Sequence, residues 1–315
     1  MKFDSVCLVV SDWEYGAATA GTSNGPDTLI EVCSNSQLPF FTQLPKVTIS
    51  QNLDDWDVNT IQLPFLKRGI PLLKHMRKLA DSIESIRKEN NNVILLSGDH
   101  SNAVGAIAGF CRNINSQRAG VVWIDAHLDL HSPYTSPSGN VHGMALNTAL
   151  QSDNTKHQER NIDEQSFSLW REIKSLKNNN CIPAANIVFI GIRSFEEQEE
   201  ALVIDENIKV IYAHEIHENG IEWAISEAHS HLQDKVDHLY VSFDVDSLDP
   251  EISRGTGTPV ENGLQKDQAI KLLSHFYHLP QTEVFEITEI NPSLDTDNSM
   301  SKAVCEILSE VLAPK

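Results

Sequence analysis

Residues 119–131 have the sequence AGVVWIDAHLDLH, in which an apolar run leads directly into acids and histidines. The apolar residues Val121 to Ile124 predict a buried strand. Side chains of an extended chain alternate between its two faces, so Asp125, His127 and Asp129 can point in the same direction. Two carboxylates and an imidazole would then converge at the strand end. Such a concentration of charge is costly unless the groups are paired, exposed or bound to a cation.

The same pattern occurs at two other places in the chain. NNVILLSGDH (residues 91–100) ends its apolar run with Asp99 and His100. HLYVSFDVDSLD (residues 238–249) ends its run with Asp244 and Asp246. Three predicted strands therefore deliver acids and histidines at their C-terminal ends, which predicts a single metal site with several ligands.

The charge of the candidate ligands favours two metal ions over one. Four carboxylates and two neutral imidazoles carry a summed charge of −4, which two divalent cations would cancel. A donor set of oxygen and imidazole without thiolate favours manganese, while iron, cobalt, nickel and zinc stay open. The candidate ligands are His100, Asp125, His127, Asp129, Asp244 and Asp246.

Predicted strands and helices alternate from residue 61 to the end of the chain. This alternation predicts an α/β fold in which a mostly parallel sheet has helices on both faces, in three α/β/α layers. Ligands of such sheets gather at the C-terminal strand ends, where the charged clusters lie. The long polar loop over residues 126–142 is of the kind that carries function. Because no linker or repeat divides the chain, we expect a single domain over residues 1–315.

Composition excludes several classes of partner. The formal net charge of −20, from 44 acidic and 24 basic residues, argues against nucleic acid and against an anionic membrane surface. We find no signal peptide and no segment able to span a membrane. The five cysteines are scattered without a CxxC pair, which predicts a reducing cytoplasm and argues against a disulfide framework or a thiolate zinc site. We expect small buried apolar side chains at all five positions. They are Cys7, Cys33, Cys111, Cys181 and Cys305.

Four motifs together resemble those of the arginase (ureohydrolase) family, which includes arginase, agmatinase, guanidinobutyrase and formimidoylglutamase. The motifs are SGDHS, DAHLD, SGNVHG and SFDVDSLDP, in the family's order between about residue 93 and residue 295. The resemblance implies an α/β fold, a centre of two Mn²⁺ ions, and hydrolysis at the carbon of a guanidinium or related amidine. It also implies a homotrimer or homohexamer.

The resemblance also assigns the metal ligands. His100 and Asp129 would hold one ion, His127 and Asp246 the other, and Asp125 and Asp244 would bridge them. Asp249 belongs to the last motif, but we expect it to cap the turn at Pro250. Asp99 is expected to be structural or to support the metal-binding histidine beside it.

The loop SPYTSPSGNVHGM (residues 132–144) most resembles that of the arginine-hydrolysing members, where it gathers an amino acid's α-carboxylate and α-amino group. Ser136, Ser138 and Asn140 match its polar groups. His131 stands where the family pattern commonly has asparagine. His142 matches the family's proton-transfer histidine, a role suited to a side chain whose ordinary pKa is near neutrality.

Other substrate contacts are implied further along the chain. In TEVFEITEINPSLD (residues 282–295), Glu289 matches the carboxylate for the substrate guanidinium, and Glu286 is its competitor from the residues alone. Thr258 is an expected neighbouring contact. Glu196 falls where the family has an aspartate for the amino group, and Ser194 replaces an acidic residue in the same stretch. We expect Glu197 and Glu200 to lie on a solvated helix face.

The resulting hypothesis is hydrolysis of L-arginine to L-ornithine and urea by a hydroxide that bridges the two ions. Asp129 would hydrogen-bond that hydroxide and pass on its proton, His142 would relay the proton, and Glu289 would hold the small-molecule guanidino substrate. Agmatinase, guanidinobutyrase or formimidoylglutamase activity is the alternative within the family. A metal-binding regulatory protein without turnover is the alternative outside it.

Overall fold

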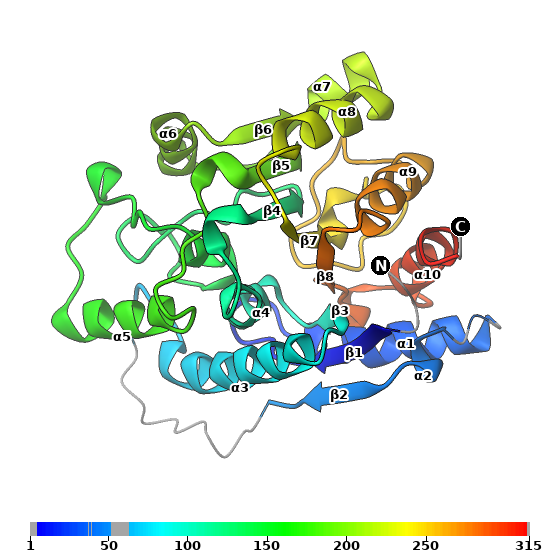
Figure 1. The fold of residues 1–315 in the computed structure, drawn as a ribbon, viewed down its shortest axis with the longest axis horizontal. Helices are drawn as coiled ribbons and strands as arrows, with labels where there is room; N and C mark the ends of the chain where they lie inside the picture. Colours follow the sequence, from blue (N-terminus) through cyan, green and yellow to red (C-terminus); the bar gives the residue numbers. More distant parts are fainter. Residues whose placement is uncertain (1–4, 37, 39, 52–62, 314–315) are drawn as a thin grey trace.

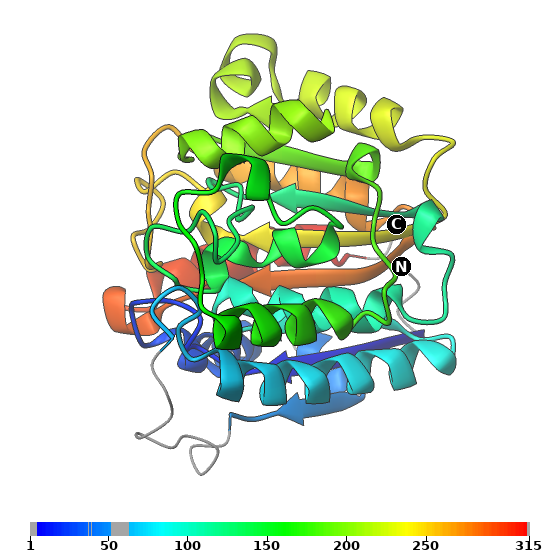
Figure 2. The same ribbon diagram turned by 90° about the vertical axis from the view of Figure 1, so that its left-hand side faces the viewer.

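A single eight-stranded sheet forms the centre of the molecule, in the order β2-β1-β3-β8-β7-β4-β5-β6. The computed structural model describes residues 5–36, 38, 40–51 and 63–313. The strands are β1 (Val6–Ser11), β2 (Lys46–Ile49), β3 (Asn92–Ser97), β4 (Ala119–Ile124), β5 (Ile187–Ile192), β6 (Lys209–Tyr212), β7 (His238–Asp244) and β8 (Thr282–Thr288). Every neighbouring pair is parallel, so the arrowheads in Figure 2 point to one edge of the sheet.

Helices cover both faces of this sheet (Figure 1). They are α1 (Gly25–Asn35), α2 (Phe40–Gln43), α3 (Gly69–Lys88), α4 (Ala103–Cys111), α5 (Glu164–Ser175), α6 (Glu197–Glu206), α7 (Ala213–Asn219), α8 (Ile221–Leu232), α9 (Lys266–Tyr277) and α10 (Ser299–Val311). Strand alternation divides the core in two. On β3, Val93 and Leu95 pack with α3 and α4, whereas Ile94 and Leu96 pack on the side of α1, α8, α9 and α10. The predicted α/β fold with a parallel sheet is confirmed.

Two helix starts differ from the predictions. The helical spacing of apolar residues between residues 61 and 89 predicts a helix whose early part is broken by Pro64 and Pro71. The structure forms α3 only from Gly69, and residues 61 and 62 lie outside the described part of the chain. Pro71 lies in the first turn of α3, where a missing N–H does no harm, so it does not break the helix. The segment DTLIEVC (residues 27–33) predicts a helix capped by Asp27. In the structure α1 already begins at Gly25, with Pro26 in its first turn.

The four central strands deliver candidate metal ligands and the candidate substrate residue Glu289 to one edge of the sheet. His100 follows β3, Asp125 follows β4, Asp244 ends β7, and Glu289 follows β8. These strands are neighbours in the order β3-β8-β7-β4. Parallel strands end at the same edge, so side chains far apart in the sequence meet there.

Within the described residues, none of the helices combines the length and the apolar character needed to cross a bilayer.

The cysteine prediction is wrong for three of the five residues. Cys33 on α1 and Cys305 on α10 form a disulfide, with their Cα atoms 5.5 Å apart. The two helices pack side by side. The two cysteines are 272 residues apart in the sequence, so this contact could not be predicted from it. Cys7 and Cys111 are free and buried as expected, whereas the free thiol of Cys181 is only partly buried.

We expect iodoacetamide to label three of the five cysteines when the protein is unfolded without reductant, because only Cys7, Cys111 and Cys181 are free. Replacing Cys33 with alanine should lower the free energy of unfolding by about 2–4 kcal/mol, since a disulfide restricts the unfolded chain. Cys181→Ala is the control and should have a much smaller effect. Labelling of all five thiols in the unreduced protein would show that the helices are not linked.

Candidate active site

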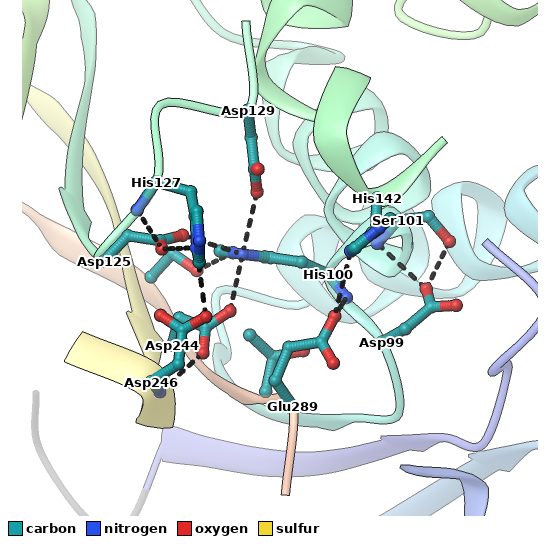
Figure 3. A network of polar contacts seen from close by, with 12 residues as sticks. Asp99, His100, Ser101, Asp125, His127, Asp129, His142, Asp244, Asp246 and Glu289 are labelled. Carbon is teal, nitrogen blue, oxygen red and sulfur yellow. Dashed lines mark hydrogen bonds and ion pairs between the residues drawn. The ribbon is translucent and has the colours of Figure 1, made fainter. Parts of the chain in front are cut away.

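A dense cluster of acids surrounds His100 at the C-terminal edge of the sheet (Figure 3). Three carboxylate oxygens lie within 3.2 Å of the Nδ1 atom of His100, one each from Asp125, Asp129 and Asp244. All four side chains are buried. The loop after β4 supplies two of these acids, and the end of β7 supplies the third.

A second cluster lies beside the first and shares Asp125 with it. The Nδ1 atom of His127 is 3.1 Å from Oδ2 of Asp246 and 3.4 Å from Oδ1 of Asp125. Figure 3 shows both histidines directed toward the same group of carboxylates. The structure therefore brings together all six predicted ligands, in two groups joined by Asp125.

The donor atoms fit metal ions. The His100 Nδ1 and Asp125 Oδ2 atoms are buried and lie 3.1 Å apart, but neither makes a hydrogen bond, which is rare for buried polar atoms unless something binds them. In His100–Asp125–Asp129 and in Asp125–His127–Asp246, one donor atom per residue lies within 4.8 Å of the others. Imidazole nitrogen and carboxylate oxygen suit a divalent cation. Each cluster can therefore hold one cation.

A buried relay behind His100 directs its Nδ1 atom toward the acids. Glu286 is fully buried and accepts a hydrogen bond from the Ser242 hydroxyl at 2.9 Å. The His100 Nε2–H must then donate to Ser242 Oγ, 2.8 Å away. Tyr240 and Ser97 also donate to Glu286, at 2.6 and 2.7 Å. The relay orients His100 toward the acids and was not predicted from the sequence.

Asp99 and Asp249 have structural roles, as expected. Asp99 accepts hydrogen bonds from the backbone N–H groups of Gly16 and Ala17, at 2.6 and 2.8 Å. Asp249 accepts from the N–H groups of Glu251 and Gly263, at 2.9 and 3.0 Å, and so stabilises the turn after the last motif. Neither aspartate belongs to the two clusters described above.

Protons compete with cations for this site. Burial opposes charge on His100 and His127, but the surrounding carboxylates raise the pKa of both histidines well above the usual value. Burial also raises the pKa of Asp244 well above its usual value, whereas its histidine neighbours lower that of Asp125 against the effect of burial. Binding of cations must therefore release protons.

We expect added Mn²⁺ to raise the melting temperature more at pH 8 than at pH 6. Groups whose folded pKa is raised stabilise the metal-free protein below their unfolded pKa, and this contribution is lost as the pH rises. Among the six candidate ligands, Asp125 alone has a lowered pKa, so its contribution to stability changes with pH in the opposite direction. A cation at one hundred times its Kd adds about 2.7 kcal/mol to the free energy of unfolding. At pH 8 fewer protons compete with the cation for its ligands. Thermal unfolding with Mn²⁺ and with EDTA tests this; an equal or larger gain at pH 6 would contradict it.

A cavity of about 250 Å³ opens above the two clusters. Its lining includes the predicted substrate residues His131, Ser136, Ser138, His142, Glu196, Thr258 and Glu289. Asn140 is buried and is not among the described residues that line the cavity. The Thr258 hydroxyl donates to Oδ2 of Asp246 at 2.9 Å, so it supports one of the acids.

Glu289 and His142 face each other in this cavity. An oxygen of Glu289 accepts a hydrogen bond from the His100 backbone N–H at 2.8 Å and lies 3.7 Å from His142 Nδ1. Glu289 has a left-handed φ of 66°, uncommon for a residue with a side chain, and such conformations concentrate at functional sites. Shielding from water lowers the pKa of His142, but Glu289 outweighs this and raises it to about 8. Glu286 lies in the relay and is not among the residues that line the cavity, so of these two glutamates Glu289 is the one that faces it.

His131 is bound by two glutamates at the far side of the cavity. Its Nε2 atom is 3.0 Å from Oε2 of Glu196 and 3.5 Å from Oε2 of Glu199. Glu199 is buried, and its carboxylate accepts hydrogen bonds from the N–H groups of Leu130 and Glu196. The sequence analysis did not single out Glu199; the signal was the capping-box spacing of Glu196 and Glu199 at the start of α6. Glu197 and Glu200 are exposed, as expected.

Comparison with known proteins gives the family. The sequence profile of the arginase family matches residues 5–313. The chain belongs to this family. It is 32% identical to arginase-1 of Sus scrofa, over 99% of this chain and 93% of that one. It is also 32% identical to arginase of Bacillus subtilis, over 79% and 78% of the two chains.

A solved structure shares the fold of this arginase-family chain. Entamoeba histolytica arginase, crystallised in complex with L-ornithine, superimposes with a TM-score of 0.83 at 27% identity, over 100% of both chains. The predictions of the arginase family and of an arginase-like amidine hydrolase are confirmed by these relatives. As a family member with clustered acids and histidines, the chain has groups suited to a metal-dependent hydrolase.

Proposed function

We propose that this arginase-family chain hydrolyses L-arginine to L-ornithine and urea, with two Mn²⁺ ions as cofactors. The observation that carries this proposal is the pair of clusters joined by Asp125, directly below a cavity that holds the carboxylate of Glu289. The related arginases and the Entamoeba arginase structure with L-ornithine support the same substrate.

The ligands are proposed as two sets that share bridging acids. His100 and Asp129 would hold one ion, His127 and Asp246 the other, and Asp125 and Asp244 would lie between them. When bound, two such ions act as a Lewis acid and lower the pKa of a water to near neutrality. The buried relay through Ser242 keeps His100 in the orientation and tautomer that this role requires.

The protein's own groups would position the substrate and move its protons. Glu289 would pair with the substrate guanidinium in the planar geometry that carboxylates offer. Asp129 would accept a hydrogen bond from the attacking water and pass the proton that this water loses towards the leaving amine. Water adds to the guanidinium carbon and one C–N bond breaks, so the departing amine of ornithine takes up a proton. His142, near Glu289 with a pKa of about 8, is placed to supply it.

The far side of the cavity would recognise the amino-acid end of the substrate. Ser136, Ser138 and His131 are proposed for the α-carboxylate and Glu196 for the α-amino group. Asn140 would act indirectly, through Ser138. Its backbone N–H donates to Ser138 Oγ at 3.1 Å and so helps to hold that hydroxyl.

A substrate panel tests the proposed function. The manganese-loaded protein is expected to turn over L-arginine with a higher kcat/KM than agmatine, guanidinobutyrate or formimidoylglutamate. Faster turnover of agmatine would favour the alternative activity and remove the α-carboxylate contacts. Absence of turnover with every substrate, across pH and divalent ions, would favour a metal-binding regulatory protein.

The remaining expectations stay predictions. A homotrimer or homohexamer is expected from the family resemblance, and size-exclusion chromatography with light scattering would measure it. The cytoplasmic location and the single domain over residues 1–315 are likewise predictions from the sequence.

A further inference from the structure

A second cavity, of about 790 Å³, lies beside α5. Its lining comes from α5 and from the segments over residues 116–117, 150–153 and 177–181. It shares no lining residue with the cavity above the metal clusters. In Figure 1, α5 lies on the same face of the sheet as α3. This cavity is therefore distinct from the candidate active site.

The acids in this lining already have partners. Asp153 accepts hydrogen bonds from Trp170 Nε1 at 2.9 Å and from Lys174 Nζ at 2.6 Å. Glu172 pairs with Arg77, at 2.9 Å. The acids of the cavity are thus already bound by other groups of the protein.

Two cations of the lining lack such partners. In the part of the chain that the structure describes, neither Arg171 nor Lys177 makes an ion pair. The protein as a whole has a net charge of −20, whereas this cavity contains two positively charged side chains without an ion-pair partner in the described structure. A local excess of positive charge of this kind attracts anions.

Lys177 is the buried cation of the cavity. It is 4% exposed, and its Nζ atom makes one described hydrogen bond, donated to the Lys174 carbonyl at 2.9 Å. An ammonium group has three donors, so two are left for a ligand. Burial lowers the pKa of Lys177 to about 8; Lys174 adds to this, and Cys181, Cys111 and Asp153 oppose it. An anion beside the amine would offset its loss of hydration.

Arg171 supplies a second donor at the exposed rim of the cavity. Its guanidinium carbon lies 5.6 Å from the ring centre of Phe167, which is 41% exposed. The guanidinium presents a rigid fork of N–H groups that matches the oxygens of a carboxylate or a phosphate. The fork can bind an anion while the apolar ring supports it.

We propose that this cavity binds a small oxyanion, a phosphate or carboxylate group, with Lys177 and Arg171 as its charged donors. The site is independent of the proposed hydrolysis. It is an anion site on a strongly acidic protein, so charge repulsion from the rest of the surface would select small ligands over polyanions.

Isothermal titration calorimetry of the full-length, manganese-loaded protein tests the proposal. Inorganic phosphate and succinate are titrated separately at pH 8 and constant ionic strength set with chloride. Repeating the titration in buffers of different ionisation enthalpy measures how many protons the protein takes up when the anion binds. We expect one site per chain and uptake of about half a proton, since an amine with a pKa of about 8 is half protonated at that pH. The tighter-binding probe identifies the oxyanion.

Lys177→Met and Arg171→Gln should each weaken binding by roughly 10- to 150-fold, the range for a hydrogen bond to a charged group. Lys302→Met, at an exposed position on α10, is the control and should leave binding unchanged. Binding of the anion to the metal ions would be unchanged in both cavity variants. Unchanged binding would therefore distinguish the metal ions from the cavity as the binding site. If Lys177→Met does not fold, the exposed Arg171→Gln variant carries the test. No binding above chloride, or equal binding by variants and wild type, overturns the proposal.

Discussion

Replacing Asp246 with asparagine should lower kcat/KM for L-arginine by about a thousand-fold or more, since metal ions contribute several kcal/mol of transition-state stabilisation. Asp246 lies 3.1 Å from His127 and belongs to the second cluster. Asparagine keeps the size of the side chain but removes the negative charge that a cation requires. Urea release and metal content per chain would be measured on the same sample, and both should fall.

Asp249 is the matched control, because it lies three residues further along the same motif. Its oxygens accept from the backbone N–H groups of Glu251 and Gly263 and take no part in either cluster. Asp249→Asn should cost about 1–3 kcal/mol of stability at most, in line with one lost buried hydrogen bond, and should keep its metal content. Equal loss of activity in the two variants would mean that the motif acts through folding and not through cation binding.

Glu289→Gln has the second largest expected effect. A hydrogen bond to a charged group contributes about 1.5–3 kcal/mol, so losing the guanidinium–carboxylate pair should lower kcat/KM for L-arginine by roughly 10- to 150-fold. Metal content should be unchanged, because Glu289 belongs to neither of the two clusters described. His142 should also titrate at a lower pH, since Glu289 is the group that raises its pKa.

Glu283 provides the control for removal of one negative charge from β8. It lies near the opposite end of the strand, where it pairs with Arg87 and, at 2.8 Å, with His238. Glu283→Gln should leave the KM for arginine unchanged. If Glu289→Gln also leaves KM and kcat unchanged, the guanidinium is bound elsewhere.

Much of the fold and of the metal site could be predicted because the signals are local. Apolar runs followed by Asp99–His100, Asp125–His127 and Asp244–Asp246 mark strand ends within a few residues. Parallel strands share an edge, so their ends converge even though the order β3-β8-β7-β4 cannot be inferred from spacing. Local pattern and sheet geometry therefore suffice to bring the six acids and histidines together.

The features that could not be predicted depend on contacts between distant parts of the chain. The disulfide between Cys33 and Cys305 requires α1 and α10 to be neighbours, which nothing near either cysteine indicates. The relay from His100 through Ser242 to Glu286 joins three strands, and each residue alone resembles ordinary strand sequence. The sequence does not distinguish the buried Glu199 from the exposed acids beside it, because burial depends on which face of α6 meets the loop after β4.

The most direct test is an anomalous difference map from crystals soaked in Mn²⁺. We expect two peaks, roughly 3.5–4 Å apart as in other two-metal sites, with Asp125 in contact with both. His100 Nδ1 should contact one peak and His127 Nδ1 the other. Peaks located away from these residues, or the absence of any peak at saturating Mn²⁺, would contradict the proposal that the strand ends form a two-metal hydrolytic centre.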